Sequence, residues 1–206
     1  MIDLYFWITD NGYKARQMIE ETGLAHNLKP VELPKREQFS PEFMKISPGH
    51  KIPALVDDDG PGGAAVTLFE SGAILKYLAE KSGGGLYPDD PAERVIVDQW
   101  LFYGSATFTT HAQQLGLFTL RFPEDVPQAK KHYADQYRDM CGIFDRRLAD
   151  SEYLAGDEYT IADIAVYPDV HVHKSYGIGI DEWTNLRRWH DAIRARPAAL
   201  RAWGPY

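Results

Sequence analysis

Short apolar runs alternate with segments of helical spacing over the first 80 or so residues. The runs fit strands, because they are brief and bounded by turn residues, and the longer segments place apolar residues three or four apart. Pro30 cannot donate to a ladder, so its strand is expected at a sheet edge. The predicted strands are Ile2–Trp7, Asn27–Leu33, Ile52–Val56 and Val66–Phe69, and the predicted helices are Lys14–Gly23, Pro41–Ile46 and Ser71–Lys81.

The pattern changes at the glycine run after Ser82, and the remainder is almost entirely helical. The expected helices are Ala92–Gly116, Pro127–Leu148, Thr160–Ser175 and Thr184–Arg194. We therefore expect two domains, an α/β domain over residues 1–83 and an all-α domain over residues 91–206. Thr160 and Asp163 have the spacing of an N-capping box, which makes Asp163 a structural residue whose loss costs about 1 kcal/mol from the cap alone.

Composition narrows the possible partners and compartments. The 206 residues are 44% hydrophobic and 25% charged, and the net charge of −8 disfavours nucleic acid or an anionic membrane as main partner. Cys141 is the single cysteine, so no intrachain disulfide forms, and its mid-helix apolar position predicts a buried, inert thiol. With neither a signal sequence nor a transmembrane run apparent, we expect a cytoplasmic protein.

Two short motifs could hold a peptide-like ligand. In Lys51-Ile52-Pro53-Ala54-Leu55, a cis bond before Pro53 would turn the Ile52 backbone outward to pair with an extended peptide, although composition alone favours the trans form. In Leu68-Phe69-Glu70-Ser71-Gly72, a strand gives way to a helix. Ser71 with the helix amides suits a carboxylate and Glu70 suits an ammonium, although a plain N-cap is the commoner explanation.

A third candidate is the turn Thr9-Asp10-Asn11-Gly12, which joins the first strand to the first helix. Backbone amides converge in such turns, yet this one contains no Cys, Ser or His that could act as a nucleophile. The histidines elsewhere lack metal-ligand spacing, so no metal site is expected. The chain also has no phosphate-binding glycine loop of known spacing and no G-x-S-x-G nucleophile motif.

Together these stretches resemble the cytosolic glutathione transferase superfamily. The resemblance covers essentially the whole chain and is carried by KIPAL at 51–55, LFESGAILKYLAEK at 68–81 and YTIADIAVYP at 159–168. It implies a thioredoxin-like first domain, a helical second domain and a homodimer. In that family the residue before a cis-proline, here Ile52 before Pro53, pairs with the cysteinyl backbone of glutathione. The pair Glu70-Ser71 binds the γ-glutamyl end.

Within the superfamily, the segments IDLYF and QFSPEF resemble the Nu class of glutathione-dependent disulfide-bond oxidoreductases and the Ure2p-like proteins. The resemblance implies further glutathione contacts from Gln38, Lys51 and Gln99. Two positions depart from the Nu-class pattern. Asp10 stands where those enzymes have proline, and His132 stands where they have an arginine that reaches glutathione across the dimer.

The resulting hypothesis assigns the sulfur chemistry to bound glutathione. Thr9, Asn11 and the backbone amides of the first turn would stabilise its thiolate for attack on a disulfide or an electrophile. Tyr5 is an alternative hydroxyl donor, because several transferase classes use a tyrosine near this strand.

Two other functions remain open at this stage. One is glutathione conjugation of hydrophobic electrophiles, for which Phe102, Tyr103 and Phe108 would line an apolar second site, unless they are helix-bundle core. The other is a non-enzymatic, glutathione-binding regulator.

Overall fold

A computed structural model describes residues 1–205, and its internal contacts divide the chain into two compact units. Unit 1 consists of Met1–Tyr87 and the segment that begins at Pro197, and unit 2 is Pro88–Arg196. None of the helices within residues 1–205 combines the length and apolar character that a membrane span requires.

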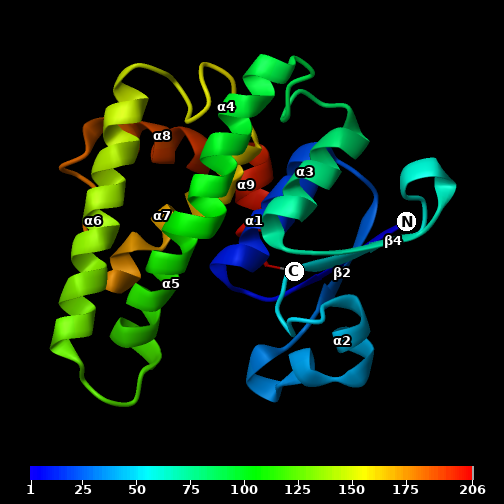
Figure 1. Cartoon of the computed structure of the whole chain (residues 1–206), viewed down its shortest axis with the longest axis horizontal. Coiled ribbons are helices and arrows are strands. Elements are labelled where there is room, and N and C mark those ends of the chain that lie inside the picture. Colours follow the sequence, from blue (N-terminus) through cyan, green and yellow to red (C-terminus); the bar gives the residue numbers. More distant parts are fainter. Residues whose placement is uncertain (206) are drawn as a thin grey trace. The chain divides into compact units, whose positions relative to one another are not determined.

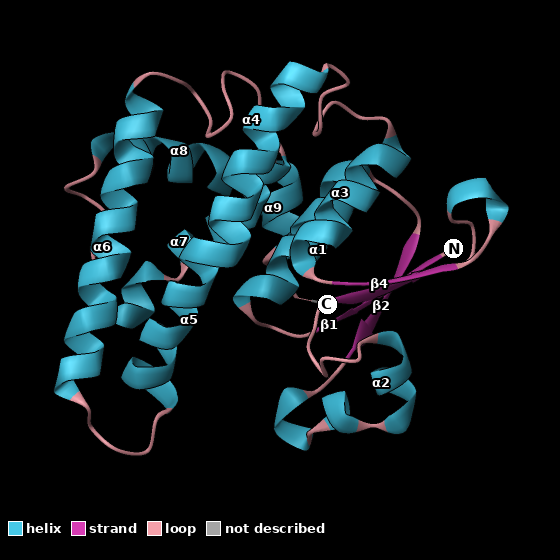
Figure 2. Cartoon of the chain, viewed as in Figure 1, coloured by secondary structure: helices cyan, strands magenta, loops and turns pink. Residues whose placement is uncertain are grey.

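A four-stranded mixed sheet forms the centre of unit 1 (Figures 1 and 2). Its order is β2-β1-β3-β4, so β2 with Pro30 is an edge strand, as the sequence predicted. β1 runs parallel to β2 and antiparallel to β3, and Leu4 lies opposite both Leu28 and Leu55. The strands are β1 (Ile2–Phe6), β2 (His26–Pro30), β3 (Ala54–Asp57) and β4 (Val66–Phe69).

The helices of unit 1 cover both faces of this sheet. Figure 2 shows α1 and α3 on one side of the sheet and α2 on the other. The order of elements gives the thioredoxin-like fold that the resemblance implied. The helices are α1 (Asp10–Thr22), α2 (Pro41–Ile46), α3 (Ser71–Ser82) and α9 (Pro197–Ala202).

Asp57, at the end of β3, connects the sheet to α3. Its side chain is 1% exposed, and its Oδ2 accepts a hydrogen bond from the Tyr77 hydroxyl at 2.5 Å and pairs with Lys81 Nζ at 2.9 Å. Burial alone would raise the pKa of this carboxyl, but these two partners and the Asp59 amide hold the pKa below its ordinary 3.8. Asp57 is therefore a structural carboxylate that must stay ionised.

The segment after Pro197 belongs to unit 1, although the sequence pattern grouped it with the helical domain. The Arg16 guanidinium donates to the main-chain carbonyls of Gly204 and Pro205, at 3.0 Å each, and to that of Arg201 at 3.3 Å. The rings of Tyr13 and Trp203 stack with centroids 3.9 Å apart. These contacts fasten the segment to α1.

Unit 2 is helical throughout. Its helices are α4 (Pro91–Phe102), α5 (Thr109–Gly116), α6 (Pro127–Ala149), α7 (Ile161–His171) and α8 (Thr184–Arg194), with π-helical stretches at Tyr103–Phe108 and Leu117–Arg121 and the 3-10 turn η6 at His173–Tyr176. Residues 161–170 of α7 are all buried, so α7 is the central helix. The predicted capping box is present, with Thr160 and Asp163 satisfying each other's backbone groups.

The aromatic residues suggested as an apolar second site behave differently from one another. Phe108 is fully buried and packs edge-on against Phe144, with ring centroids 4.9 Å apart. Tyr103 is half-buried, and its ring centroid lies 5.7 Å from that of Phe144. Phe102 is 62% exposed. Phe108 is therefore core of unit 2 and does not line a site, because its ring is enclosed by other aromatic rings.

Candidate functional site

The turn between β1 and α1 is shaped by Thr9 and Gly12. Thr9 is the N-cap of α1, and its hydroxyl oxygen accepts the Gly12 amide at 3.1 Å. A Cβ at position 12 would lie 2.0 Å from the Trp7 carbonyl oxygen, so only glycine fits there. The Thr9 hydroxyl keeps its proton available for a further acceptor. Asp10 opens the helix, where a carboxylate interacts favourably with the helix dipole.

Asn11 and Ser71, 60 positions apart, meet in the structure. The Ser71 hydroxyl donates to Asn11 Oδ1 at 3.5 Å, which brings together the N-termini of α1 and α3. Glu70, the N-cap of α3, makes no side-chain capping bond, so the first amides of α3 are not satisfied by their cap. The N-terminus of α3, whose first amides no cap satisfies, is suited to an anionic group.

Glu70 and Ile52 flank this region. Glu70 is exposed and has φ 74°, a left-handed conformation that few residues other than glycine adopt. The Ile52–Pro53 peptide bond is cis, as the family resemblance implied and composition alone did not. Because β3 begins at Ala54, Ile52 lies outside the ladder, and no other group within residues 1–205 bonds its main-chain N–H or C=O. Both groups can therefore pair with a ligand.

Two buried polar atoms elsewhere in unit 1 also lack partners within residues 1–205. They are Oε1 of Gln38 and Nδ1 of His50, and buried polar atoms without a partner are uncommon in native proteins. His50 has φ 46°, and its ring centroid lies 5.4 Å from that of Phe39. The spacing of the histidines in the sequence presented His50 only as a possible metal ligand. Its place directly before the Lys51-Ile52-Pro53 motif was the signal for a ligand-binding role.

Tyr5 packs against a buried cluster, and Lys51 lies at the surface. Tyr5 packs beside the buried cluster of Val31, Phe43 and Ala54, with its ring centroid 6.0 Å from that of Phe43. Packing in this cluster makes Tyr5 a weaker candidate for a reactive hydroxyl than Thr9. The Lys51 side chain is exposed, and the Lys51 backbone is held by the Ser47 hydroxyl, which donates to the Lys51 carbonyl at 2.8 Å.

Gln99 and His132 lie in unit 2, on α4 and α6, and both are exposed. The His132 ring meets the Tyr133 ring edge-on, with centroids 5.1 Å apart. Their contacts with glutathione stay predictions that rest on the family resemblance.

Cys141 cannot take part in thiol chemistry as the protein is folded. It is fully buried in α6, and burial raises the pKa of its thiol well above the ordinary value. A reactive thiol needs both access and thiolate character, and Cys141 has neither. The prediction of a buried, inert thiol is therefore confirmed.

The fold and the site define a two-domain protein with a thioredoxin-like unit, in which the main-chain groups of Ile52 make no hydrogen bond within residues 1–205 and the N-termini of α1 and α3 meet. The family model for the glutathione S-transferase N-terminal domain matches residues 2–80, and that for the glutathione S-transferase C-terminal domain matches residues 106–197. The chain thus belongs to the glutathione S-transferase family, which confirms the resemblance seen in its motifs.

Individual relatives are similar over nearly the full length. The chain is 40% identical to disulfide-bond oxidoreductase YfcG of Escherichia coli K12, over 98% of this chain and 94% of that protein. A glutathione transferase family member from Pseudomonas fluorescens, solved with two glutathione bound, superimposes with TM-score 0.91 at 35% identity, covering 98% and 91% of the two chains. A glutathione transferase from Pseudomonas putida, solved with one glutathione disulfide bound per subunit, superimposes with TM-score 0.92 at 36% identity. The match covers 98% of this chain and 90% of that chain.

Proposed function

We propose that the protein is a glutathione-dependent disulfide-bond reductase in which bound glutathione provides the reactive sulfur. The inertness of Cys141 carries this proposal, because the chain has no other thiol and a disulfide can be exchanged only by a thiolate. The identity to YfcG, a disulfide-bond oxidoreductase, supports the same activity. Glutathione supplies two thiols for each disulfide reduced, so one glutathione disulfide and two product thiols are formed.

The residues of unit 1 have groups that match glutathione chemically. The main-chain groups of Ile52 fit the peptide part, and the amides at the start of α3 with Ser71 fit a carboxylate. Glu70 fits the α-ammonium. Gln38 and His50 supply buried polar atoms that lack a partner within residues 1–205, which is the arrangement expected where a polar ligand completes the hydrogen bonding.

Thr9 and Asn11 are proposed to stabilise the thiolate. The Thr9 hydroxyl, the Asn11 amide and the amides of the first turn of α1 are donors, and hydrogen bonds to a thiolate lower the pKa of the thiol. Two helix N-termini add a favourable field for the same charge. A more populated thiolate attacks disulfides faster near neutral pH.

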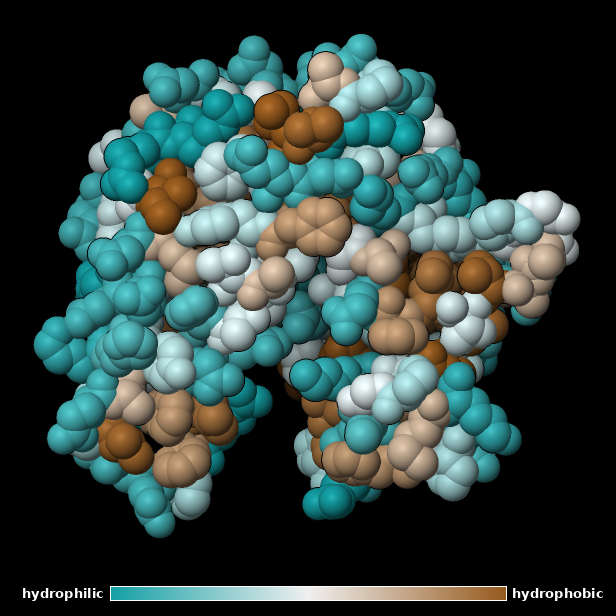
Figure 3. All heavy atoms as spheres, in the orientation of Figure 1, coloured by the Kyte–Doolittle hydropathy of each residue, from teal (hydrophilic) through white to brown (hydrophobic). Residues whose placement is uncertain are grey.

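A homodimer and a cytoplasmic location complete the proposal. Apolar side chains remain on the surface of α4, where Val95 is 64% exposed and Phe102 is 62% exposed. They lie seven positions apart and so on one side of the helix. Figure 3 shows hydrophobic side chains at the surface over the first part of α4. Such a face suits a second copy of the chain, and sedimentation velocity measures the mass of the resulting dimer.

Cell fractionation tests the cytoplasmic location.

Substitution of the first turn tests the mechanism. We expect Asn11→Ala to slow glutathione-dependent reduction of hydroxyethyl disulfide on the order of 100-fold, the effect of removing one donor to a developing anion. Asn27→Ala, an exposed asparagine of β2 in the same unit, is the matched control. Cys141→Ala should retain the wild-type rate because the thiol is buried.

The same set of proteins separates the competing functions. Full activity of Asn11→Ala would remove Asn11 from the mechanism. Loss of activity in a folded Cys141→Ala protein would overturn the view that glutathione provides all the sulfur. Glutathione binding by calorimetry without turnover would identify a regulator, and faster conjugation of an aromatic electrophile would identify a transferase.

A further inference from the structure

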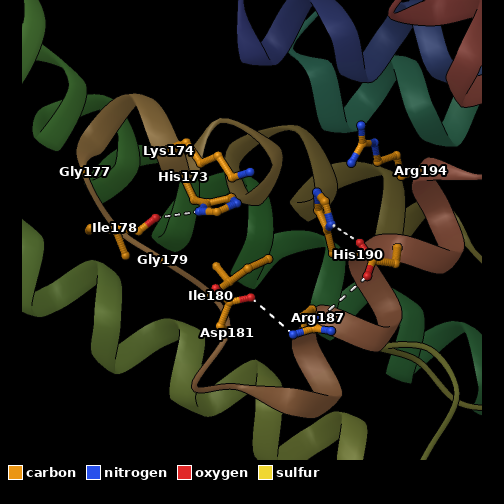
Figure 4. A pocket seen from close by; sticks show the side chains of 11 residues that line it. His173, Lys174, Gly177, Ile178, Gly179, Ile180, Asp181, Arg187, His190 and Arg194 are labelled. Atoms are coloured by element: carbon orange, nitrogen blue, oxygen red, sulfur yellow. Dashed lines mark hydrogen bonds and ion pairs between the residues drawn. The ribbon is translucent and has the colours of Figure 1, made fainter.

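Unit 2 contains a cavity of about 370 Å³ between η6 and α8 (Figure 4). The volume falls within the range of small-molecule sites, roughly 300–1,000 Å³. Figure 4 shows the side chains of His173 and Lys174 on the η6 side and those of His190 and Arg194 on the α8 side. Residues 177–180, which include Ile178 and Ile180, complete the wall of the cavity. None of these residues belongs to the proposed glutathione site.

Two of the basic side chains that line the cavity, Lys174 and Arg194, make no ion pair with a carboxylate within residues 1–205. Arg187 pairs with Asp181 at 3.3 Å and lies 4.0 Å from Asp191, so its charge is balanced by both carboxylates. For Lys174 and Arg194, in contrast, no acidic group within residues 1–205 lies at ion-pair distance. Two unbalanced cations beside one cavity stand out in a chain of net charge −8.

His173 adds a directed hydrogen-bonding group. It is 5% exposed, and its Nδ1 donates to the Ile178 carbonyl at 2.5 Å. This bond fixes the ring and leaves Nε2 without a partner within residues 1–205. Both ring nitrogens are donors in the imidazolium form, and in that form Nε2 can donate to an anionic ligand.

His190 adds charge that depends on pH. Its Nδ1 lies 3.1 Å from Asp191 Oδ1, and its Nε2 lies 3.0 Å from His171 Nδ1. The Tyr167 hydroxyl also lies 3.0 Å from His171 Nδ1. The pKa of His171 is lowered to about 4, first by burial and then by four nearby basic groups. In order of decreasing effect, these are His190, Arg194, His173 and Lys174.

We propose that this cavity binds a small phosphorylated molecule, with its phosphate at Lys174, Arg194 and His173 and its organic part against Ile178 and Ile180. Phosphate pairs well with guanidinium and ammonium groups, and Arg recognises it through several N–H donors. Three cations and two carboxylates line the cavity, so a phosphate group offsets a net positive charge there. Ile178 and Ile180 line the cavity with 3% and 4% of their surface exposed, so the organic part meets only a small apolar area there.

Isothermal titration calorimetry with phenyl phosphate tests this site in the full-length protein at constant ionic strength. We expect Lys174→Ala/Arg194→Ala to weaken binding at least roughly tenfold, because it removes both unbalanced cations. Arg121→Ala/Arg146→Ala removes the same charge from exposed positions of unit 2 outside the cavity and is the matched control. Equal affinity for the two double variants, or no binding by the wild type at millimolar ligand, would overturn the proposal. Unchanged thermal unfolding verifies that each variant is folded.

Two further arms identify the ligand class and the role of the histidines. Inorganic phosphate should bind more weakly than phenyl phosphate, and equal affinity would mean that the site takes free phosphate and that the organic part of the proposal is wrong. Sulfate stays a dianion from pH 5 to 8, so it reports the protein's titration alone. The groups that face His190 are Tyr167 and His171 of α7, His173 and Lys174 of η6, and Asp191 and Arg194 of α8. Because the pKa of His190 is lowered from 6.5, its positive charge develops only as the pH falls below that value. Sulfate should therefore bind more tightly at pH 5.5 than at pH 8, and pH-independent binding would exclude His190 from the site.

Discussion

Removal of the Asp163 carboxylate should destabilise unit 2 far more than the loss of a helix cap. Asp163 is 0% exposed, and its Oδ1 accepts from the Leu154 amide at 2.9 Å and from Trp189 Nε1 at 2.8 Å. Its Oδ2 accepts from the Thr160 amide at 2.9 Å. One side chain therefore joins the start of α7 to the preceding loop and to α8.

The magnitude follows from what Asp163→Ala leaves behind. The cap contributes about 1 kcal/mol, and the buried donors of Leu154 and Trp189 each cost roughly 1–3 kcal/mol when left unpaired. Burial raises the pKa of the Asp163 carboxyl, so removing the carboxylate also recovers some desolvation energy. We therefore expect a loss of about 3–5 kcal/mol from an unfolding free energy of about 5–15 kcal/mol.

Urea unfolding followed by circular dichroism measures this loss. Asp157→Ala removes an exposed carboxylate from the loop before α7 and should change stability by less than about 0.5 kcal/mol. In a double-mutant cycle, Trp189→Phe should couple to Asp163→Ala by roughly 1–3 kcal/mol. If Asp163→Ala does not fold, Asp163→Asn, which keeps one acceptor, replaces it. A loss of only about 1 kcal/mol with no coupling would show that Asp163 acts only as a helix cap.

Two predictions concern acid stability. Asp57→Asn should lower the free energy of unfolding by about 1–3 kcal/mol at pH 7. Because the pKa of Asp57 is lowered in the folded protein, the wild type loses this stability below about pH 4, and the variant should lose much less there. Parallel acid-unfolding curves for the two proteins would contradict this. His171 has its pKa lowered from 6.5 to about 4, so the unfolded chain binds its proton first and wild-type stability should fall as the pH drops from 6.5 to 4. His171→Gln should flatten that slope in urea titrations at several pH values, and an unchanged slope would show that other groups cause it.

The sequence pattern predicted the elements of the fold better than their ends. The predicted first helix begins at Lys14 because Thr-Asp-Asn-Gly is typical of a turn, whereas α1 begins at Asp10 under the Thr9 cap. The predicted third strand begins at Ile52, but β3 begins at Ala54, since the residues around Pro53 lie outside the ladder. The π-helical stretch at Tyr103–Phe108 interrupts a helix that the pattern predicts as continuous, because periodicity over such a short stretch does not distinguish α from π turns.

The candidate site was predictable to the extent that its residues lie in contiguous motifs. The pairs Ile52-Pro53 and Glu70-Ser71 each combine a backbone feature with a polar group in adjacent positions, which a sequence displays directly. The bond between Asn11 and Ser71 depends on how α1 and α3 pack, and no local pattern encodes it. His50 has no motif of its own, and its unpartnered Nδ1 is visible only in three dimensions.

The attachment of residues 197–205 to α1 has a consequence for the order of synthesis. Residues 1–87 of unit 1 are translated before unit 2, but the carbonyls that Arg16 binds arrive only after all of unit 2 has been translated. At about 5–20 residues per second, this separates the two parts by roughly 5–20 s. During that interval the surface of α1 around Tyr13 and Arg16 lacks its covering segment, so the synthesis of the thioredoxin-like unit begins before that of unit 2 and ends after it.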